Sequence, residues 1–186
     1  KGGTVWEKGR TLLLKHIKEK SHLINVDKVL ECAFICAFDL TNSPFHERPT
    51  KWRCGQLFLK EGQGQEVVVL TEEFGELKKM ELVYTDDKPC HPYVDLWMKT
   101  GDKELTVMQV TGSRVWTRVS QKCEDLEKAI NLLNESQNNK KNKWKFKALM
   151  LAPNVAKTPE HSGTRDQISV LTTEARGWLG GLAQLC

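Results

Sequence analysis

The sequence PYVDLWMKTGDKELTVMQVT, residues 92–111, contains two apolar runs with a short polar segment between them. In residues 93–98, and again in residues 105–110, side chains on one face of an extended chain alternate with side chains on the other. The intervening Thr100–Lys103 (TGDK) is typical of a tight turn. We therefore predict two adjacent strands joined by a hairpin.

Two polar side chains stand out in these apolar runs, Asp95 in the first and Gln109 in the second. The alternation places Asp95 on the same face as Trp97, and Val94 on the same face as Leu96. A carboxylate beside an amide on paired strands is either a hydrogen-bonded pair inside the core or the remnant of a metal site. We favour the buried pair, which would fix the two central strands against each other.

The residues before this hairpin predict two helices followed by strands. Apolar side chains recur at steps of three and four in the helices, and β-branched residues are frequent in the strands. Short links between the strands favour a meander. The predicted elements are helices at Thr4–Ser21 and Asp27–Leu40 and strands at Trp52–Lys60, Glu66–Glu72 and Leu77–Thr85.

The residues after the hairpin predict a helix, Thr117–Asn134, and then a strand, Trp144–Leu151. A strand, helix and strand in this order form a crossover unit, so we expect residues 105–110 and 144–151 to be parallel and right-handed. A last strand at Gln167–Thr172 and a weak helix at Thr173–Leu185 complete the chain. The fold class predicted is α/β, with a central mixed sheet flanked by helices.

Composition agrees with one α/β domain over residues 1–186, in which residues 1–40 form N-terminal helices, 52–151 the sheet core with its crossover helix, and 152–186 a C-terminal extension. The net charge of +4 is mild and does not by itself indicate a nucleic-acid binder. No apolar run is long enough to span a bilayer, and the first residues lack the profile of a signal peptide, so we expect neither a membrane protein nor a secreted one. The abrupt ends suggest a fragment or a processed chain.

The six cysteines are scattered along the chain, which favours free thiols in a reducing compartment. Cys32 and Cys36 lie on one face of a predicted helix, with His46, Cys54 and Cys90-His91 further on. Zinc needs four converging ligands, usually from closely spaced pairs, so buried thiols are the preferred interpretation and a zinc site is the alternative.

A basic segment lies between the crossover helix and the strand that follows it. Alternation directs Trp144 and Phe146 inward, so these rings are core side chains rather than platforms for bases. The exposed lysine face can pair with phosphates, or it can protect the sheet from edge-to-edge association. The candidate nucleic-acid-binding residues are Lys140, Lys141, Lys143, Lys145 and Lys147.

Several of these segments carry a resemblance to a known family. They are TVWEKGRTLLLKHI (residues 4–17), LKKMELVYT leading to HPYVDLWMK (77–99), LTVMQVT (105–111), the helix VSQKCEDLEKAINLLN (119–134) and WKFKALMLAP (144–153). Together they resemble the C-terminal region of the trypanosomatid retrotransposon hot spot (RHS) proteins over roughly Thr4 to Ala152. Pro92-Tyr93-Val94-Asp95 and Gln109-Val110-Thr111 match the family's strand motifs.

The resemblance implies a restriction-endonuclease-like core of the PD-(D/E)xK type and a nuclear or perinuclear protein linked to chromatin, transcription or RNA handling. A cytoplasmic location is the alternative. In such nucleases, Mg²⁺ is held by a strand aspartate and a second acid, with a lysine two residues beyond the second acid. Asp95 corresponds to the aspartate, whereas Gln109 and Thr111 stand at the other two positions. Many family members carry a P-loop ATPase domain upstream, but this chain has no G-x-x-x-x-G-K-[ST] motif and therefore no such ATP site.

We therefore expect a non-catalytic nuclease-like module that binds nucleic acid, DNA or RNA, or a nuclear protein partner, and that needs no cofactor. The alternative is a Mg²⁺-dependent nuclease, in which Asp95 and Gln109 are catalytic, Asp95 binds the metal, and Glu7 contributes from the first helix. A third interpretation is a pure protein-interaction scaffold.

Overall fold

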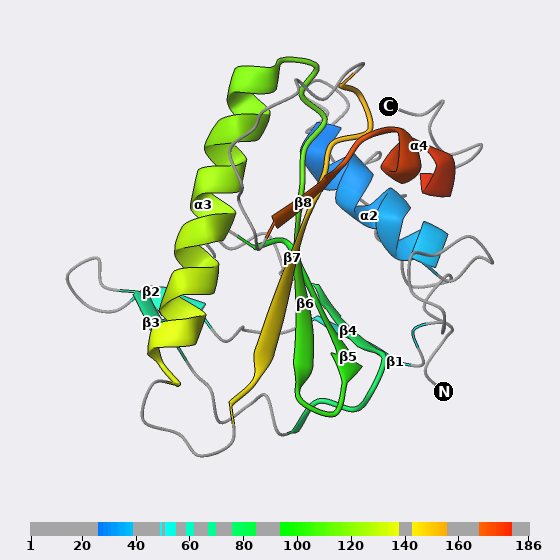
Figure 1. Ribbon diagram of the computed structural model, residues 1–186. Helices are drawn as coiled ribbons and strands as arrows, with labels where there is room; N and C mark the ends of the chain where they lie inside the picture. The colour runs from blue at the N-terminus through cyan, green and yellow to red at the C-terminus, as the bar shows by residue number, and fades with distance from the viewer. Residues whose placement is uncertain are drawn as a thin grey trace.

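The computed structural model describes residues 26–38, 49, 51–54, 59–61, 67–69, 76–84, 94–137, 143–155 and 168–179 (Figure 1). The predicted helix Thr4–Ser21, which includes Glu7, lies outside these residues, as do Lys140 and Lys141.

The central element is a six-stranded mixed sheet with the strand order β1-β4-β5-β6-β7-β8. Neighbours β4, β5 and β6 are antiparallel, and β1 with β4, β6 with β7 and β7 with β8 are parallel. The strands are β1 (Lys51–Cys54), β4 (Glu81–Tyr84), β5 (Leu96–Gly101), β6 (Glu104–Val110), β7 (Lys145–Leu151) and β8 (Ile168–Leu171). This arrangement confirms the predicted α/β class with a mixed sheet.

The central hairpin forms as predicted. β5 ends at Gly101 and β6 begins at Glu104, so two residues make the turn. Trp97 pairs with Val107, and the register shifts between Lys99 and Gly101. The predicted meander is therefore present in β4, β5 and β6.

The strands before β4 differ from the prediction. β1 runs parallel to β4, and the described residues of the predicted Trp52–Lys60 strand belong to two sheets, residues 52–54 to β1 and residues 59–60 to β2 (Leu59–Glu61). β2 pairs with β3 (Val67–Val69), the described part of the predicted Glu66–Glu72 strand, in a separate two-stranded antiparallel sheet. Parallel neighbours need a long crossover connection, and residues 55–80 between β1 and β4 provide it. Because β-branched runs suit any sheet, the Val-rich sequence could not specify which sheet it joins.

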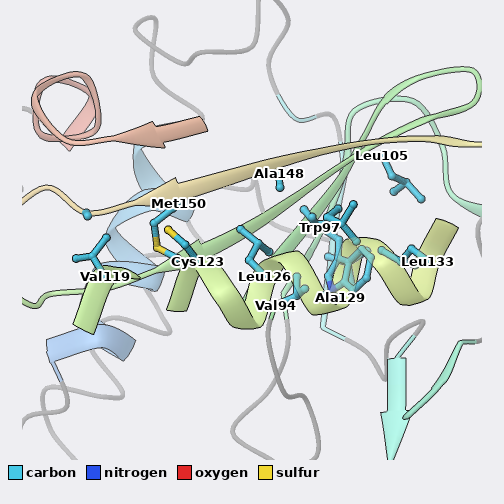
Figure 2. Close-up of a cluster of buried hydrophobic side chains, with 14 of the residues drawn as sticks. Val94, Trp97, Leu105, Val119, Cys123, Leu126, Ala129, Leu133, Ala148 and Met150 are labelled. Carbon is cyan, nitrogen blue, oxygen red and sulfur yellow. The ribbon is translucent and has the colours of Figure 1, made fainter. Parts of the chain in front are cut away.

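Among the described residues, three helices flank the sheet: α2 (Val26–Phe38), α3 (Trp116–Glu135) and α4 (Thr173–Leu179). α3 connects β6 to β7, and these strands are parallel, as predicted, with Gln109 opposite Met150. The apolar stripe read from the sequence is the buried face of α3, formed by Val119, Cys123, Leu126, Ile130 and Leu133. Figure 2 shows this stripe packed on the sheet.

The two faces of the sheet support two apolar layers. On one face, Trp97 and Val107 pack with the buried stripe of α3 (Figure 2). On the other face, Leu96 and Met108 pack with Phe34 of α2 and with α4. β6 contributes to both layers, because alternate residues of a strand point to opposite faces.

Residues beyond 151 contribute to this architecture. β8 pairs with β7 over its whole length, and Ala175 and Leu179 of α4 are buried in the α2 layer. Part of the region predicted as an extension therefore forms the sixth strand and covers the sheet. None of the helices in the described ranges is long and apolar enough to cross a bilayer.

Candidate functional site

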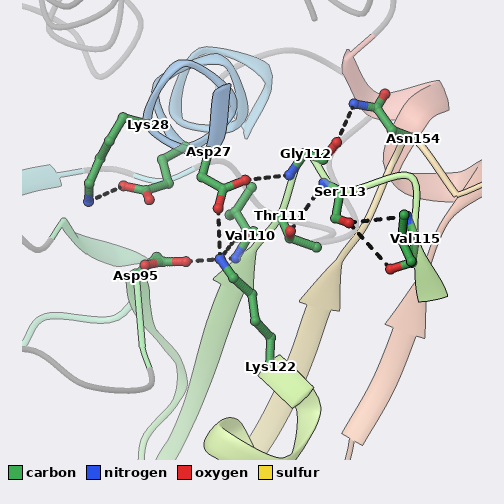
Figure 3. Close-up of polar contacts among 11 residues, drawn as sticks. Asp27, Lys28, Asp95, Val110, Thr111, Gly112, Ser113, Val115, Lys122 and Asn154 are labelled. Carbon is green, nitrogen blue, oxygen red and sulfur yellow. Dashed lines mark hydrogen bonds and ion pairs between the residues drawn. The ribbon is translucent and has the colours of Figure 1, made fainter. Parts of the chain in front are cut away.

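Asp95 lies where the chain enters β5. Its backbone N–H donates to the carbonyl of Met108 (2.9 Å), and its Oδ2 accepts a hydrogen bond from the backbone N–H of Val110 (2.8 Å; Figure 3). The carboxylate takes the place of a backbone carbonyl, so it continues the β5–β6 ladder past the first residue of β5. This bond holds the start of β5 against the end of β6.

We expected Asp95 and Gln109 to form a hydrogen-bonded pair, and this prediction is wrong. The Gln109 side chain is buried, and its Oε1 has no hydrogen-bond partner. The alternation also begins later than predicted, because β5 starts only at Leu96 and Val94 packs in the same layer as Trp97. The bend at Asp95 breaks the two-residue period, so the carboxylate meets the β6 backbone instead of the neighbouring amide.

A second acid, Glu31 of α2, belongs to the same neighbourhood. Glu31 is 2% exposed, and its Oε2 accepts a hydrogen bond from Lys28 Nζ at 2.8 Å. Burial, and then the negative charge of Asp95, raise the pKa of Glu31 to about 8, against the lowering effect of Lys28. At neutral pH, Glu31 therefore holds its proton and contributes little negative charge.

The pKa of Asp95 is also raised, because burial disfavours its charged form. The hydrogen bond from Val110 and the positive charges of Lys122 and Lys28 oppose this effect, and the charge of Asp27 adds to it. Two acidic side chains from different elements thus share one partly buried region with raised pKa values, which is a recognised mark of functional sites but also of structural networks.

Lys122 of α3 joins three elements at this end of the sheet. Its Nζ lies 2.9 Å from Oδ2 of Asp27, in the first turn of α2, and 3.0 Å from the carbonyl oxygen of Val110, at the end of β6 (Figure 3). The other oxygen of Asp27 accepts a hydrogen bond from the backbone N–H of Gly112 at 2.6 Å. We call the contacts among Asp27, Lys122, Val110 and Gly112 the Lys122 clasp.

The oxygen atoms near Asp95 do not form a set of ligands that suits a divalent metal ion. Mg²⁺ requires about six oxygen ligands, usually including several carboxylates. Among the described residues, no group of three or more His, Cys, Asp or Glu side chains could hold a metal ion. The Lys122 ammonium instead contacts a carboxylate and a carbonyl oxygen, the two ligand types that such an ion would use.

The zinc alternative gains no support from the cysteines that are described. Cys32, Cys36 and Cys123 are buried free thiols. Burial, and then the charge of Glu31, raise the pKa of Cys32 to about 12, so its thiol stays protonated and is a poor metal ligand. His46, Cys90 and His91 lie outside the described residues.

The predicted lysine face is present but lies at the other end of the sheet. Lys143, Lys145 and Lys147 are exposed, as alternation predicted. Lys145 pairs in register with Glu104 at the start of β6, whereas Asp95 lies beside Val110 at its end. Six residues of strand separate the two ends, about 20 Å at the usual rise per residue.

Glu104 reduces the positive charge of this lysine face. Its Oε1 lies 2.9 Å from Lys147 Nζ and accepts a hydrogen bond from Thr100. Partial burial raises the pKa of Glu104, but the hydrogen bonds from Lys147 and Thr100 outweigh it, so the pKa is lowered. Glu104 therefore stays ionised and neutralises part of the charge of this face.

Sequence reasoning did not identify Glu31 or Lys122. Glu31 had a local signal, because it is the only charged residue in the apolar segment 29–38 (VLECAFICAF). Lys122 had none, because a lysine on an amphipathic helix usually faces water. Only the packing of α3 beside the end of β6 brings its ammonium to Val110.

Comparison with known proteins identifies no relative: no family model matches the chain, and no curated protein and no solved structure is significantly similar. The fold and this site define a mixed α/β unit in which one buried acid, Glu31, and two partly buried acids, Asp27 and Asp95, lie near the Lys122 clasp beside the end of β6.

Proposed function

We propose that the chain is a non-catalytic, nuclease-like module that binds nucleic acid. The element order α2, the β4–β5–β6 meander, α3 and β7 supports this proposal, because a helix, a meander and a crossover strand are what the restriction-endonuclease-like core implied by the resemblance would require. Within that framework, Asp95 corresponds to the strand aspartate and Gln109 to the second acid, which is here an uncharged amide.

The observation that carries the proposal is the position of the Lys122 ammonium. It contacts Asp27 and the Val110 carbonyl beside Asp95, so a positive charge of the chain itself already compensates the acids. A divalent ion would have to displace this ammonium and strip the proton from Glu31. Both requirements disfavour metal-dependent cutting at this place.

Nucleic-acid binding is supported by the exposed lysine face. Lys143 and Lys145 extend from the start of β7 beside the β5–β6 hairpin, and Lys147 follows on the same face. Phosphate contacts release counterions, so binding should weaken steeply as salt is raised. A scaffold that recognises proteins through apolar contacts would not show this dependence.

The first experiment tests for cutting. Supercoiled plasmid DNA and single-stranded RNA are incubated with the wild-type chain in Mg²⁺ or Mn²⁺, with Asp95→Asn and Glu31→Gln as matched variants. We expect no cleavage above background in any sample. Cleavage that disappears in Asp95→Asn would contradict the proposal and establish a metal-dependent nuclease.

That nuclease is the second candidate, and the proximity of Glu31 to Asp95 favours it, since it supplies the further acid that the β6 motif lacks. In that case Glu31→Gln should abolish cutting together with Asp95→Asn. If cleavage persists in both variants, the activity arises elsewhere.

The second experiment tests for binding. Gel shifts with duplex DNA are measured from low to physiological salt for the wild type and for Lys143→Glu/Lys145→Glu/Lys147→Glu. We expect the wild-type shift to weaken with salt and the triple variant to lose it. If the wild type shows no shift on any nucleic acid, the scaffold interpretation replaces this one.

The RHS resemblance and the nuclear or perinuclear location remain proposals alongside this function. A fluorescent fusion of the chain expressed in a trypanosomatid cell should accumulate in or around the nucleus. A uniform cytoplasmic signal would contradict the location.

A further inference from the structure

The segment that joins β6 to α3 has an unusual combination of side chains. Arg114 and Arg118 are exposed, Val115 between them is 55% exposed, and Trp116 is half-buried against the α3 layer. Val115 is the only exposed large hydrophobic side chain among the described residues. We call residues 114–118 the arginine segment.

The positive charges of the arginine segment destabilise α3, the helix that begins within this segment. α3 has no acidic residue in its first turn and no basic residue in its last turn, and Val115 supplies no side-chain cap to the first N–H groups. Cations are unfavourable near the positive end of a helix, where acids and capping oxygens are normally found. A local arrangement that costs stability without a structural gain is typical of a functional site.

Within the part of the chain that the structure describes, no ion pair and no side-chain hydrogen bond engages the guanidinium of Arg114 or Arg118. Both arginines therefore present their full charge to solvent at the same end of the sheet as the Lys122 clasp.

The backbone that precedes this segment is held in place from several sides. The N–H of Thr111 donates to Leu151 at the end of β7, and the carbonyl of Gly112 accepts a hydrogen bond from Asn154. Ser113 Oγ accepts from the N–H of Val115 (Figure 3). The arginine segment is therefore preorganised, which lowers the entropy cost of binding a partner.

We propose that the arginine segment binds a single-stranded nucleic acid, with Arg114 and Arg118 on its phosphates and Trp116 and Val115 against its bases. Paired cations and an accessible ring are the combination that single-strand sites use, because every base has a face that can stack. The rings on the lysine face, Trp144 and Phe146, are half-buried like Trp116. The Trp144 ring, however, already has the Lys99 ammonium 5.3 Å from its centroid, so it is less open to a base. This inference rests on the proposed nucleic-acid-binding function and adds to it a second surface and a preference for unpaired strands.

The test uses fluorescence anisotropy of a labelled 20-nucleotide oligothymidylate and of a 20-base-pair duplex, each titrated over a range of salt. Arg114→Ala/Arg118→Ala should weaken oligothymidylate binding at least about tenfold and lower the salt dependence by about 0.7 in log–log slope per lost contact. Arg114→Lys/Arg118→Lys should restore the slope. Lys128→Ala, on the exposed side of the same helix, is the control and should change neither value.

Trp116 provides an independent readout. Trp116→Phe keeps a ring and should bind oligothymidylate nearly as well as the wild type, whereas Trp116→Leu should lose about tenfold in affinity for the single strand and little for the duplex. Circular dichroism verifies that both variants are folded.

The outcomes separate the two proposals. If the wild type binds and the arginine variant binds the single strand equally well, this inference is overturned and the proposed function stands. If the wild type binds neither probe, the binding function itself fails. If metal-dependent cutting is found but the arginine variant still loses single-strand binding, the non-catalytic assignment fails and this inference holds.

Discussion

Glu31 is a carboxyl group inside an apolar layer, and its protonation is coupled to folding. Its pKa is about 8 in the folded chain and 4.5 as a free side chain. Between these values, the folded chain holds a proton that the unfolded chain releases, so the free energy of unfolding contributed by Glu31 falls as pH rises from 4.5 to 8. The raised pKa of Asp95 acts in the same direction.

Glu31→Gln should therefore remove part of this pH dependence. The variant should resemble the wild type near pH 5 and exceed its stability at pH 9 by an amount on the order of a few kcal/mol, at 1.36 kcal/mol per pKa unit. Urea unfolding of both proteins from pH 5 to pH 9 measures the difference. Parallel curves for the two proteins would show that Glu31 is not the titrating group.

Gln109 is a further residue whose environment costs stability. An unbonded amide oxygen in a buried position forfeits its hydration, typically at about 1–3 kcal/mol. Gln109→Leu should therefore be neutral or raise the free energy of unfolding by about 1 kcal/mol, because an apolar side chain of similar size needs no partner. Chemical unfolding checks this, and a loss above about 1 kcal/mol would indicate that the amide has a partner in solution.

At the scale of the element, the sequence predicted α3 and the β5–β6 hairpin well. The α3 stripe from Val119 to Leu133 repeats over about four turns, and the TGDK turn fixes the hairpin register, so local chemistry alone specifies both. The strand β7 was predictable for the same reason, since lysines alternate with apolar residues from Lys143 to Ala148. Strong periods over many residues leave few alternatives.

The candidate site was less predictable, because it depends on contacts between distant elements. In the Lys122 clasp, Asp27 contacts Gly112, which lies 85 positions further along the chain, and Lys122, which lies 95 positions further. Asp95 contacts β6 by accepting a hydrogen bond from the backbone N–H of Val110. Sequence patterns report which face a side chain occupies, but not which backbone group it reaches when a strand bends. The partner of Asp95 was therefore predicted incorrectly, and Asp95 lies at the bend just before β5 instead of within the predicted strand.

The Lys122 clasp should stabilise the packing of α2 and α3 against the end of β6. Lys122→Met removes the ion pair with Asp27 and the hydrogen bond to Val110 and should cost about 1 kcal/mol, since both charged groups are partly exposed. Lys128→Met, which removes the exposed pair with Asp125, should change the stability by less than about 0.5 kcal/mol. Equal effects in thermal unfolding would show that the clasp contributes no more than a surface pair.

At the scale of the whole molecule, the two apolar layers need the residues after 151. Leu179 is 2% exposed in the α2 layer, and β8 covers the outer edge of β7. The order β1-β4 and the separation of β2 and β3 were not predictable, because parallel pairing is decided by long connections rather than local pattern.

A chain truncated after Val155 should therefore lose its native fold. It would expose the edge of β7 and the apolar surface that α4 covers, so we expect aggregation or a non-cooperative unfolding transition. Glu174→Ala, at an exposed position of α4, is the control and should leave unfolding unchanged. A soluble truncated chain with a sharp transition would mean that residues 156–186 are an independent appendage.

β6 supplies side chains to both apolar layers, and every one of its residues from Leu105 to Val110 is buried. Neither layer can separate from this strand without uncovering the side chains that anchor the other. The last backbone amides to exchange with deuterated solvent should therefore be those of β6, at a rate set by global unfolding, with the helices on either side opening earlier.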